Sequence, residues 1–340
     1  MSAPDPDVAQ EAIEYAYEQG WSDGLPLVPV SEPLLERLLA QTDRSPDEVI
    51  GGMPQVDREV TVRTAAINAA MAGCRPEYFP VVLAAWEALM LERTTKGGGW
   101  QSTSGPAPLI IVNGAVRERL GINSTGGIFG PGFRANATIP RAIGLIVRNA
   151  FGVRPHELEQ ATQGVPGRWQ ICFGENEEDS PWGPLSAERG TEGDAVTTVL
   201  LRTSEFVDNR HTKSAEELLA DFADSIGRTG PWIFAHAQVG LVLCPEHAQR
   251  LADAGYDRPA IRAWLAERSG RTAGQLAAVG KTRGEGGART AGEPADPEAF
   301  ERTIADPESM LIAVAGARTA GISMVVRYFA DWSGRSVPVA

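Results

Sequence analysis

The stretch QVGLVLCPEHAQRLADAG, residues 238–255, predicts a buried β-strand that passes directly into an α-helix. Its first half is short, apolar and rich in branched residues, as in a strand covered on both faces. Pro245 then stands where proline is well tolerated, at the start of a helix. A strand followed at once by a helix is the repeating unit of α/β proteins.

The same pattern recurs along the chain. Further buried strands are predicted at PLIIVNG (108–114), WQICFG (169–174), AVTTVLLR (195–202) and MLIAVAG (310–316). Helices are predicted between them, for example at TIPRAIGLIVRNAF (138–151) and SAEELLADFADSIG (214–227). The alternation favours an α/β fold with mixed or parallel sheets covered by helices.

The length of 340 residues suits one large α/β domain or two lobes. We predict an N-terminal helix or tail over 1–20, a first lobe over 21–190 with a Gly/Asn-rich loop, and a second over 191–340 with a flexible loop at 269–298. A weak internal similarity suggests that the two lobes are alike. Cys74-Arg-Pro-Glu and Cys244-Pro-Glu each precede a predicted helix, and PLIIVNG resembles MLIAVAG. Matches this short also arise by chance.

Composition restricts partners and location. A formal charge of −13 argues against nucleic acid and anionic membrane surfaces as partners. Three cysteines without a CxxC pair indicate a reducing compartment. The N-terminus has no signal-like apolar region and no run of eighteen apolar residues occurs, so a cytoplasmic protein is expected. Ala-rich helices would suit a homo-oligomer.

The segment GINSTGGIFGPGFRANATIPRA, residues 121–142, predicts a binding loop for a small anion. Its glycines leave backbone N–H groups accessible, and a helix starting near Ala137 would direct its positive end toward the loop. The alternative is an Ω-loop in which asparagines only make turns and caps. The substrate-binding residues predicted here are Asn123, Ser124, Gly126, Gly127, Gly130, Gly132, Arg134, Asn136 and Arg141.

A second Gly-rich segment, KGGGWQSTSGPAPLIIVNG (96–114), adds polar groups that could orient a ligand. Trp100 and Gln101 precede the predicted strand, and Asn113 ends it. The serines here do not form a GxSxG elbow, so serine hydrolysis has no support.

Three residues are the predicted catalytic groups. Cys74 lies at a helix start beside Arg75, and both features favour a thiolate with a lowered pKa; the alternative is a small buried hydrophobic residue. Glu175 directly follows a strand, and partial burial could raise its pKa. His247 lies in the first turn after a strand end, where catalytic groups of open α/β sheets gather; the alternative is a helix-start histidine hydrogen-bonded to a neighbouring loop. His236, Cys244 and His247 could bind a metal, but no second motif supports such a site, so none is predicted.

The segments WSDGLPLVPV, INAAMAGCRPEYFPVVLAA, GINSTGGIFGPGFRANATIPRA, GENEEDSPWGPL and LCPEHAQRLADAGY resemble a widespread, mostly uncharacterised bacterial family associated with UGSC-type (seleno)proteins. The resemblance runs from Trp21 to about Trp264. UGSC-type proteins suggest thiol or selenol nucleophiles, but that chemistry does not transfer to this chain as a motif. The resemblance directs attention to Cys74, Glu175, His247 and the loop from Gly126 to Asn136. The chain has no Cys-Gly-Ser-Cys, and it reads VAGARTAGISMVV where the family has Gly-Gly followed by histidine.

These observations together predict an enzyme that acts on a small anionic metabolite through a thiol nucleophile or acid–base chemistry. Lyase, transferase and thiol-dependent reductase chemistry all fit, and the cofactor is unknown. One alternative is a non-catalytic subunit that binds a small molecule or a partner. Another is a metal-dependent hydrolase or hydratase.

Overall fold

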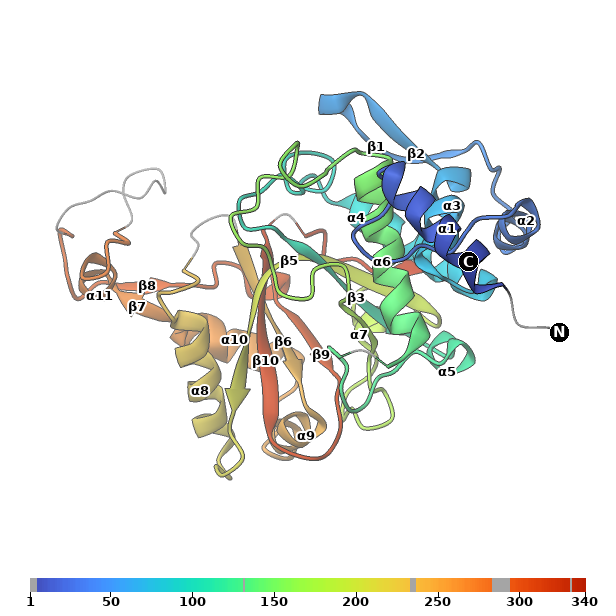
Figure 1. The fold of residues 1–340 in the computed structure, drawn as a ribbon. Helices are drawn as coiled ribbons and strands as arrows, with labels where there is room; N and C mark the ends of the chain where they lie inside the picture. The colour runs from blue at the N-terminus through green and yellow to red at the C-terminus, as the bar shows by residue number, and fades with distance from the viewer. Residues whose placement is uncertain (1–4, 131, 233–236, 283–293, 331) are drawn as a thin grey trace.

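The computed structural model describes residues 5–130, 132–232, 237–282, 294–330 and 332–340 (Figure 1). The elements before the main sheet are α1 (Pro6–Glu18), α2 (Glu32–Leu39), β1 (Val49–Met53), η1 (Pro54–Val56), β2 (Arg58–Thr61), α3 (Val62–Ala72), η2 (Pro76–Tyr78) and α4 (Phe79–Leu91). The main sheet contains β3 (Ala107–Asn113), β4 (Cys172–Gly174), β5 (Ala195–Asp208), β6 (Ala237–Leu243), β9 (Leu311–Val314), β10 (Ile322–Phe329) and β11 (Val337–Pro338). The remaining elements are α5 (Val116–Leu120), α6 (Arg134–Asn149), α7 (Leu185–Glu188), α8 (Ala215–Gly227), α9 (Pro245–Asp253), α10 (Arg258–Arg268), β7 (Gly270–Thr272), α11 (Ala273–Ala277), β8 (Phe300–Arg302) and η4 (Pro307–Ser309).

The main sheet is mixed, which confirms the predicted α/β class. Its order is β4-β3-β5-β10-β6-β9, and β11 pairs with β5. β3 lies between parallel β4 and antiparallel β5, while β6 lies between parallel β9 and antiparallel β10. The long strands β5 and β10 pair antiparallel at the centre. The sheet therefore consists of two halves with the same topology.

The structural repeat relates different segments from those that the sequence similarity suggested. PLIIVNG forms β3, whose counterpart is β6, and MLIAVAG forms β9, whose counterpart is β4. Cys74 precedes a helix that leads into β3, whereas Cys244 precedes a helix that follows β6. The proposed matches are therefore wrong. Strands from both predicted lobes belong to one sheet, and the division near residue 190 stays a prediction.

Side chains that alternate along the strands fill separate cores. On β3, Ile110 and Val112 join the cluster of helices α3, α4 and α6, while Leu109 and Ile111 join residues of β5, β9 and β10 on the other face. Helices α8, α9 and α10 cover the second half of the sheet. In Figure 1, α8 and α10 lie to the left of the central strands, α3, α4 and α6 lie to the right, and α9 lies below. Strand residues buried on both faces explain the unbroken apolar runs in the sequence.

The carboxyl ends of β4 and β9, at opposite edges of the sheet, are joined. Asn176 N donates to Val314 O at 2.8 Å, just beyond β4. Gly316 N, beyond β9, donates to Ser124 O at 2.9 Å. These bonds bring the loop after α5 and the segment after β4 against the end of β9. We call this contact between the two edge strands the seam.

The loop predicted over 269–298 is partly wrong. Residues 270–272 form β7, which pairs with β8, and residues 273–277 form α11 with a Thr272/Gln275 capping box and a buried Leu276. The pattern missed these elements because they are short and their partner strand is distant in sequence. Residues 283–293 lie outside the described residues. In the described part of the chain, no helix has the length and apolar character needed to span a bilayer.

Candidate functional site

The predicted anion-binding loop is fastened to the fold through its asparagines. Asn136 Oδ1 accepts from Asn123 N at 2.9 Å, and Asn136 Nδ2 donates to Asn123 O and to Cys172 O at 3.1 and 2.9 Å. Asn123 Oδ1 in turn accepts from Thr125 N at 3.0 Å. Both side chains are buried and occupied. The two asparagines therefore form turns and hold the loop to the fold, as in the alternative interpretation of an Ω-loop.

Other predicted loop residues have separate tasks. Arg134 donates from Nε and Nη2 to Gly73 O at 3.0 and 2.9 Å, which satisfies a carbonyl at the end of α3. Gly127 and Gly132 have φ values of 74° and 127°, where glycine is favoured. Gly126 lies 3.5 Å, measured from an ideal Cβ, from Ala317 Cβ. These contacts stabilise the conformation of the loop and do not form a ligand-binding site.

A cavity of about 370 Å³ lies where this loop meets the start of α6. Gly130, Asn136 and Arg141 line it, as the sequence predicted for a binding site. The sequence did not indicate the other polar and aromatic lining residues, Asp23, Phe129, Thr138, Arg168, Trp169 and Gln170. We call this space the Arg141 cavity.

Arg141 is paired with Asp23 across the cavity wall. Its Nε lies 2.9 Å from Asp23 Oδ2 and its Nη2 lies 2.8 Å from Asp23 Oδ1. Burial alone would raise the pKa of the Asp23 carboxyl, but Arg141 and the backbone donors of Leu25 and Asp23 outweigh it and hold that pKa below its usual value. Arg141 Nη2 also donates to Leu25 O and Pro26 O at 3.2 and 3.0 Å, so a ligand would have to replace a carboxylate and compete with two carbonyl groups.

Arg168 is incompletely satisfied. Its Nη1 lies 2.8 Å from Glu159 Oε1 and its Nε donates to Pro106 O at 2.8 Å. The buried Nη2 atom has no hydrogen-bond partner among the described residues. The guanidinium carbon lies 4.8 Å from the ring centroid of Trp169, and Trp169 has a φ of 68°. A large residue in the left-handed region is uncommon, and such strain gathers at functional sites.

Trp100 and Gln101 do not line the Arg141 cavity. Trp100 is fully buried, donates from Nε1 to Thr95 O at 2.8 Å and lies 5.6 Å from Trp169, centroid to centroid. Gln101 is half-buried beside it. Trp100 thus supports the wall residue Trp169 from behind and is not available to a ligand.

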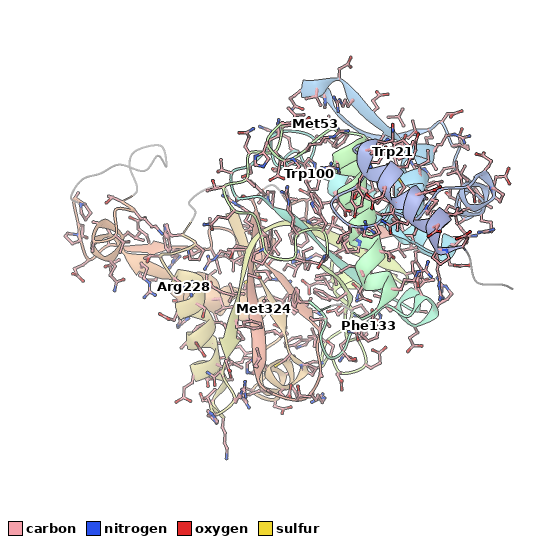
Figure 2. All side chains as sticks on the ribbon, viewed as in Figure 1. Trp21, Met53, Trp100, Phe133, Arg228 and Met324 are labelled. Carbon is pink, nitrogen blue, oxygen red and sulfur yellow. The ribbon has the colours of Figure 1, made fainter. Side chains whose placement is uncertain are left out.

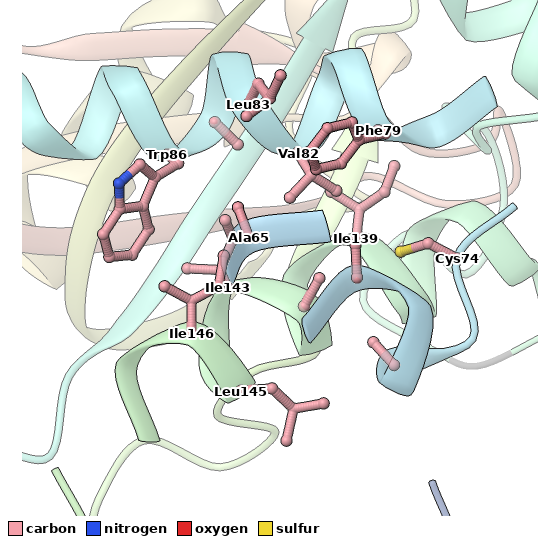
Figure 3. Packing of buried hydrophobic residues seen from close by; sticks show 14 of the residues in the cluster. Ala65, Cys74, Phe79, Val82, Leu83, Trp86, Ile139, Ile143, Leu145 and Ile146 are labelled. Carbon is pink, nitrogen blue, oxygen red and sulfur yellow. The ribbon is translucent and has the colours of Figure 1, made fainter. Parts of the chain in front are cut away.

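Cys74 lies in a hydrophobic core. Figure 3 shows it next to Ile139 and Phe79, among packed side chains of α3, α4 and α6. Its Sγ donates to Thr138 O at 3.3 Å, and burial raises the pKa of the thiol to about 12. The predicted lowering of this pKa is therefore wrong, because loss of hydration outweighs the nearby arginines.

Glu175 is also fully buried, and its carboxylate connects several parts of the fold. Its carboxylate accepts from Asn113 Nδ2 and Leu185 N, each at 2.6 Å, and forms an ion pair with Arg258 Nη2 at 2.7 Å. Burial raises the pKa of this carboxyl, as expected, although Arg258 and the hydrogen bonds oppose the shift. Asn113 also donates to Glu177 Oε1 at 2.8 Å. Every bond here is internal to the fold.

His247 is held by two partners. Its Nε2 lies 2.9 Å from Asn209 O, which can only accept, so Nδ1 accepts from Ser323 Oγ at 2.8 Å when the ring is neutral. Burial lowers the pKa of His247 despite the bond to Asn209. Ser323 was missed because nothing in its own sequence context marks it. Among the described residues no cluster of His, Cys, Asp and Glu could hold a metal, and His236 lies outside them.

The structure does not bring the predicted catalytic groups into one site. Among the described residues, no hydrogen bond or ion pair joins any two of Cys74, Glu175 and His247, and none of the three lines the Arg141 cavity. Neither a scan of protein-family models nor a search of curated proteins finds a match to this chain. The family resemblance therefore stays a prediction.

Proposed function

We propose that this protein binds a small molecule with carboxylate or phosphate oxygens in the Arg141 cavity. The observation that carries the proposal is the convergence of two arginines, Arg141 and Arg168, on one partly enclosed space at the start of α6. Guanidinium groups suit planar oxyanions, and the first turn of a helix adds a positive partial charge. Asp23 and Glu159 balance the charges of these two arginines in the unliganded protein, so a ligand oxyanion would have to compete with these carboxylates.

The state of Arg168 supports the same conclusion. Its buried Nη2 has no partner among the described residues, and an unmade hydrogen bond on a buried charged group is costly. Because this atom is buried, a ligand oxygen would recover that energy only after the Arg168 side chain turns toward the cavity. Gln170 and Thr138 supply further polar atoms in the lining. The remaining wall, formed in part by Phe129 and Trp169, would enclose the organic part of the ligand.

This proposal concerns binding, and catalysis stays a separate prediction. Cys74, Glu175 and His247 are buried and engaged inside the fold, so none is placed against a ligand in this cavity. A cytoplasmic location is part of the proposal, because Cys74, Cys172 and Cys244 are all free, which suits a reducing compartment. A homo-oligomeric state also stays a prediction.

Calorimetric titration with malonate and with inorganic phosphate tests the proposal. We expect at least one probe to bind, and Arg168→Met to weaken binding about tenfold or more through loss of a charge-assisted bond. Arg119→Met is the matched control, because the side chain of Arg119 is 59% exposed and pairs with Asp194 away from the cavity. Circular dichroism verifies folding. No binding of either probe, or equal loss in both variants, would contradict the proposal.

A further inference from the structure

A second cavity, of about 620 Å³, lies beneath helix α1. We call it the α1 cavity. Trp21, which begins the segment leading to α2, lies beside α1 (Figure 2). The apolar lining comes from α1, from the segment 21–30, and from helices α2 and α3, and consists of Ala12, Tyr15, Ala16, Trp21, Leu27, Val28, Pro29, Val30, Leu35, Ile67 and Met71. A space of this size and character resembles the sites that take small organic molecules.

The polar lining is confined to a few groups. Asn149 Nδ2 donates to Asn68 Oδ1 at 2.9 Å and to Trp21 O at 3.2 Å, which holds the Trp21 backbone. The buried Asn149 Oδ1 has no hydrogen-bond partner among the described residues. Gln19 is the remaining neutral polar side chain. Among the described residues that line the cavity, Arg154 is the only charged one. The cavity is therefore apolar with a single fixed positive charge.

Arg154 differs from the arginines of the Arg141 cavity because it is unpaired. Its guanidinium has no hydrogen-bond or ion-pair partner in the described part of the chain, and its Nε atom is buried. One charged neighbour is another cation, Arg148; burial lowers the pKa of Arg148 and the charge of Arg154 lowers it further, while the carboxylates of Asp23 and Glu157 oppose the shift. Two like charges near an apolar space make an anion there favourable.

We propose that the α1 cavity binds a hydrophobic monocarboxylic acid, with the carboxylate on Arg154 and the apolar body between α1 and α3. One guanidinium matches one carboxylate, whereas a dicarboxylate or a nucleotide would bury charge that nothing in the lining neutralises. Tyr15 and Trp21, whose ring centroids lie 5.7 Å apart in an edge-on arrangement, favour an aromatic body.

This site is separate from the Arg141 cavity, although the two share a wall. Along the segment 21–30, Trp21, Leu27 and Val28 face the α1 cavity, while Asp23 and Leu25 face the Arg141 cavity. On α3, Met71 lines the α1 cavity and Ala72 lines the Arg141 cavity. The two proposals rest on different arginines, so one can fail while the other holds.

Calorimetric titration of the full chain with 3-phenylpropionate, octanoate and 3-phenylpropanamide tests the inference. We expect 3-phenylpropionate to bind, the uncharged amide to bind at least about tenfold more weakly, and Arg154→Met to remove most of this preference. Ala12→Trp, which places a large ring at the half-buried lining position on α1, should block both acids. Arg37→Met, an exposed arginine on the neighbouring helix α2, is the matched control and should bind like the parent.

Thermal unfolding of each variant separates loss of the site from loss of the fold. Malonate binding in Arg154→Met should be unchanged, which distinguishes this cavity from the other. Three results would overturn the inference: no binding of either acid at millimolar concentration, equal affinity for acid and amide, or parent-like affinity in a folded Arg154→Met variant.

Discussion

Glu175 Oε1 lies 2.7 Å from Arg258 Nη2, and both side chains are buried. Glu175 follows β4 and Arg258 opens α10, so this ion pair connects the two topologically similar halves of the sheet. Val314 N, on the opposite sheet edge, donates to the same carboxylate oxygen at 3.2 Å. The seam between the edge strands is therefore organised around one acidic side chain.

Glu175→Gln should destabilise the fold strongly. Removing the charge leaves the buried Arg258 with only its longer ion pair to Glu188, at 3.4 Å, and breaking one side of a buried ion pair costs about 3–5 kcal/mol. Urea unfolding measures the change. Glu178→Gln is the matched control, because the side chain of Glu178 is 57% exposed and its pairing with Arg117 contributes about 1 kcal/mol or less. Similar losses in both variants would show that the buried pair is not special.

Local patterns predicted β3, β4, β5, β6 and β9, but not the central strand β10 and not which strands are neighbours. The apolar runs at β3 and β9 lie where the sequence placed them, because burial on both faces leaves a signal within a few residues. The central pairing of β5 with β10 joins segments far apart in the chain, and no local periodicity encodes it. The repeat was misassigned for the same reason.

The residues of the Arg141 cavity were likewise predictable only where the signal was local in the sequence. Of the loop residues found from local composition, Gly130, Asn136 and Arg141 line a cavity, whereas the other predicted glycines do not. Arg168 and Asp23 were missed because they reach it from other segments. Cys74 was misread because a helix start and a neighbouring arginine are local signals, whereas Ile139 and Thr138, which help to bury and bind it, come from α6.

Cys74 should resist alkylation in the native protein. Since burial raises its thiol pKa to about 12, almost no thiolate exists at pH 8.5, and reagent has little access. Iodoacetamide labelling followed by mass spectrometry should detect Cys74 only after unfolding in urea. A cysteine introduced at the exposed position Ser45 serves as the reactive reference. Labelling of native Cys74 as fast as that reference would refute the buried assignment.

His247 should make stability decrease as the pH falls below about 6.5. Burial holds its folded pKa below that of the unfolded chain, about 6.5, so the unfolded state takes up the proton first as the pH falls. Stability is complete above about pH 6.5 and decreases below it, by at most about 1.4 kcal/mol per pH unit, until the folded pKa is passed. Urea unfolding at several pH values should show this slope in the parent and in an exposed control, His211→Gln, but not in His247→Gln. An unchanged slope in His247→Gln would contradict the assignment.

Gly144→Ala should destabilise the protein although alanine is the better helix former. An ideal Cβ at this position on α6 would lie 2.7 Å from ring atoms of Trp169. The helix preference is worth about 1 kcal/mol, whereas overpacking costs about 1–3 kcal/mol and would displace a wall of the Arg141 cavity. Thermal unfolding and malonate titration should both show a loss. Gly98→Ala, where nothing lies within 4 Å of the new methyl group, is the control and should change stability by less than about 0.5 kcal/mol.

Asp23→Asn should tighten the binding of a small anion in the Arg141 cavity. Asp23 competes with a ligand for Arg141, and its side chain is 20% exposed, so removing the charge while keeping the shape should release about 1 kcal/mol, or about fivefold in affinity. Malonate titration measures the gain. Asp47→Asn makes the same change in net charge at a side chain that is 90% exposed, and it should leave the affinity within about twofold of the parent. Weaker binding in Asp23→Asn would mean that the Asp23–Arg141 pair builds the cavity wall and does not compete with the ligand.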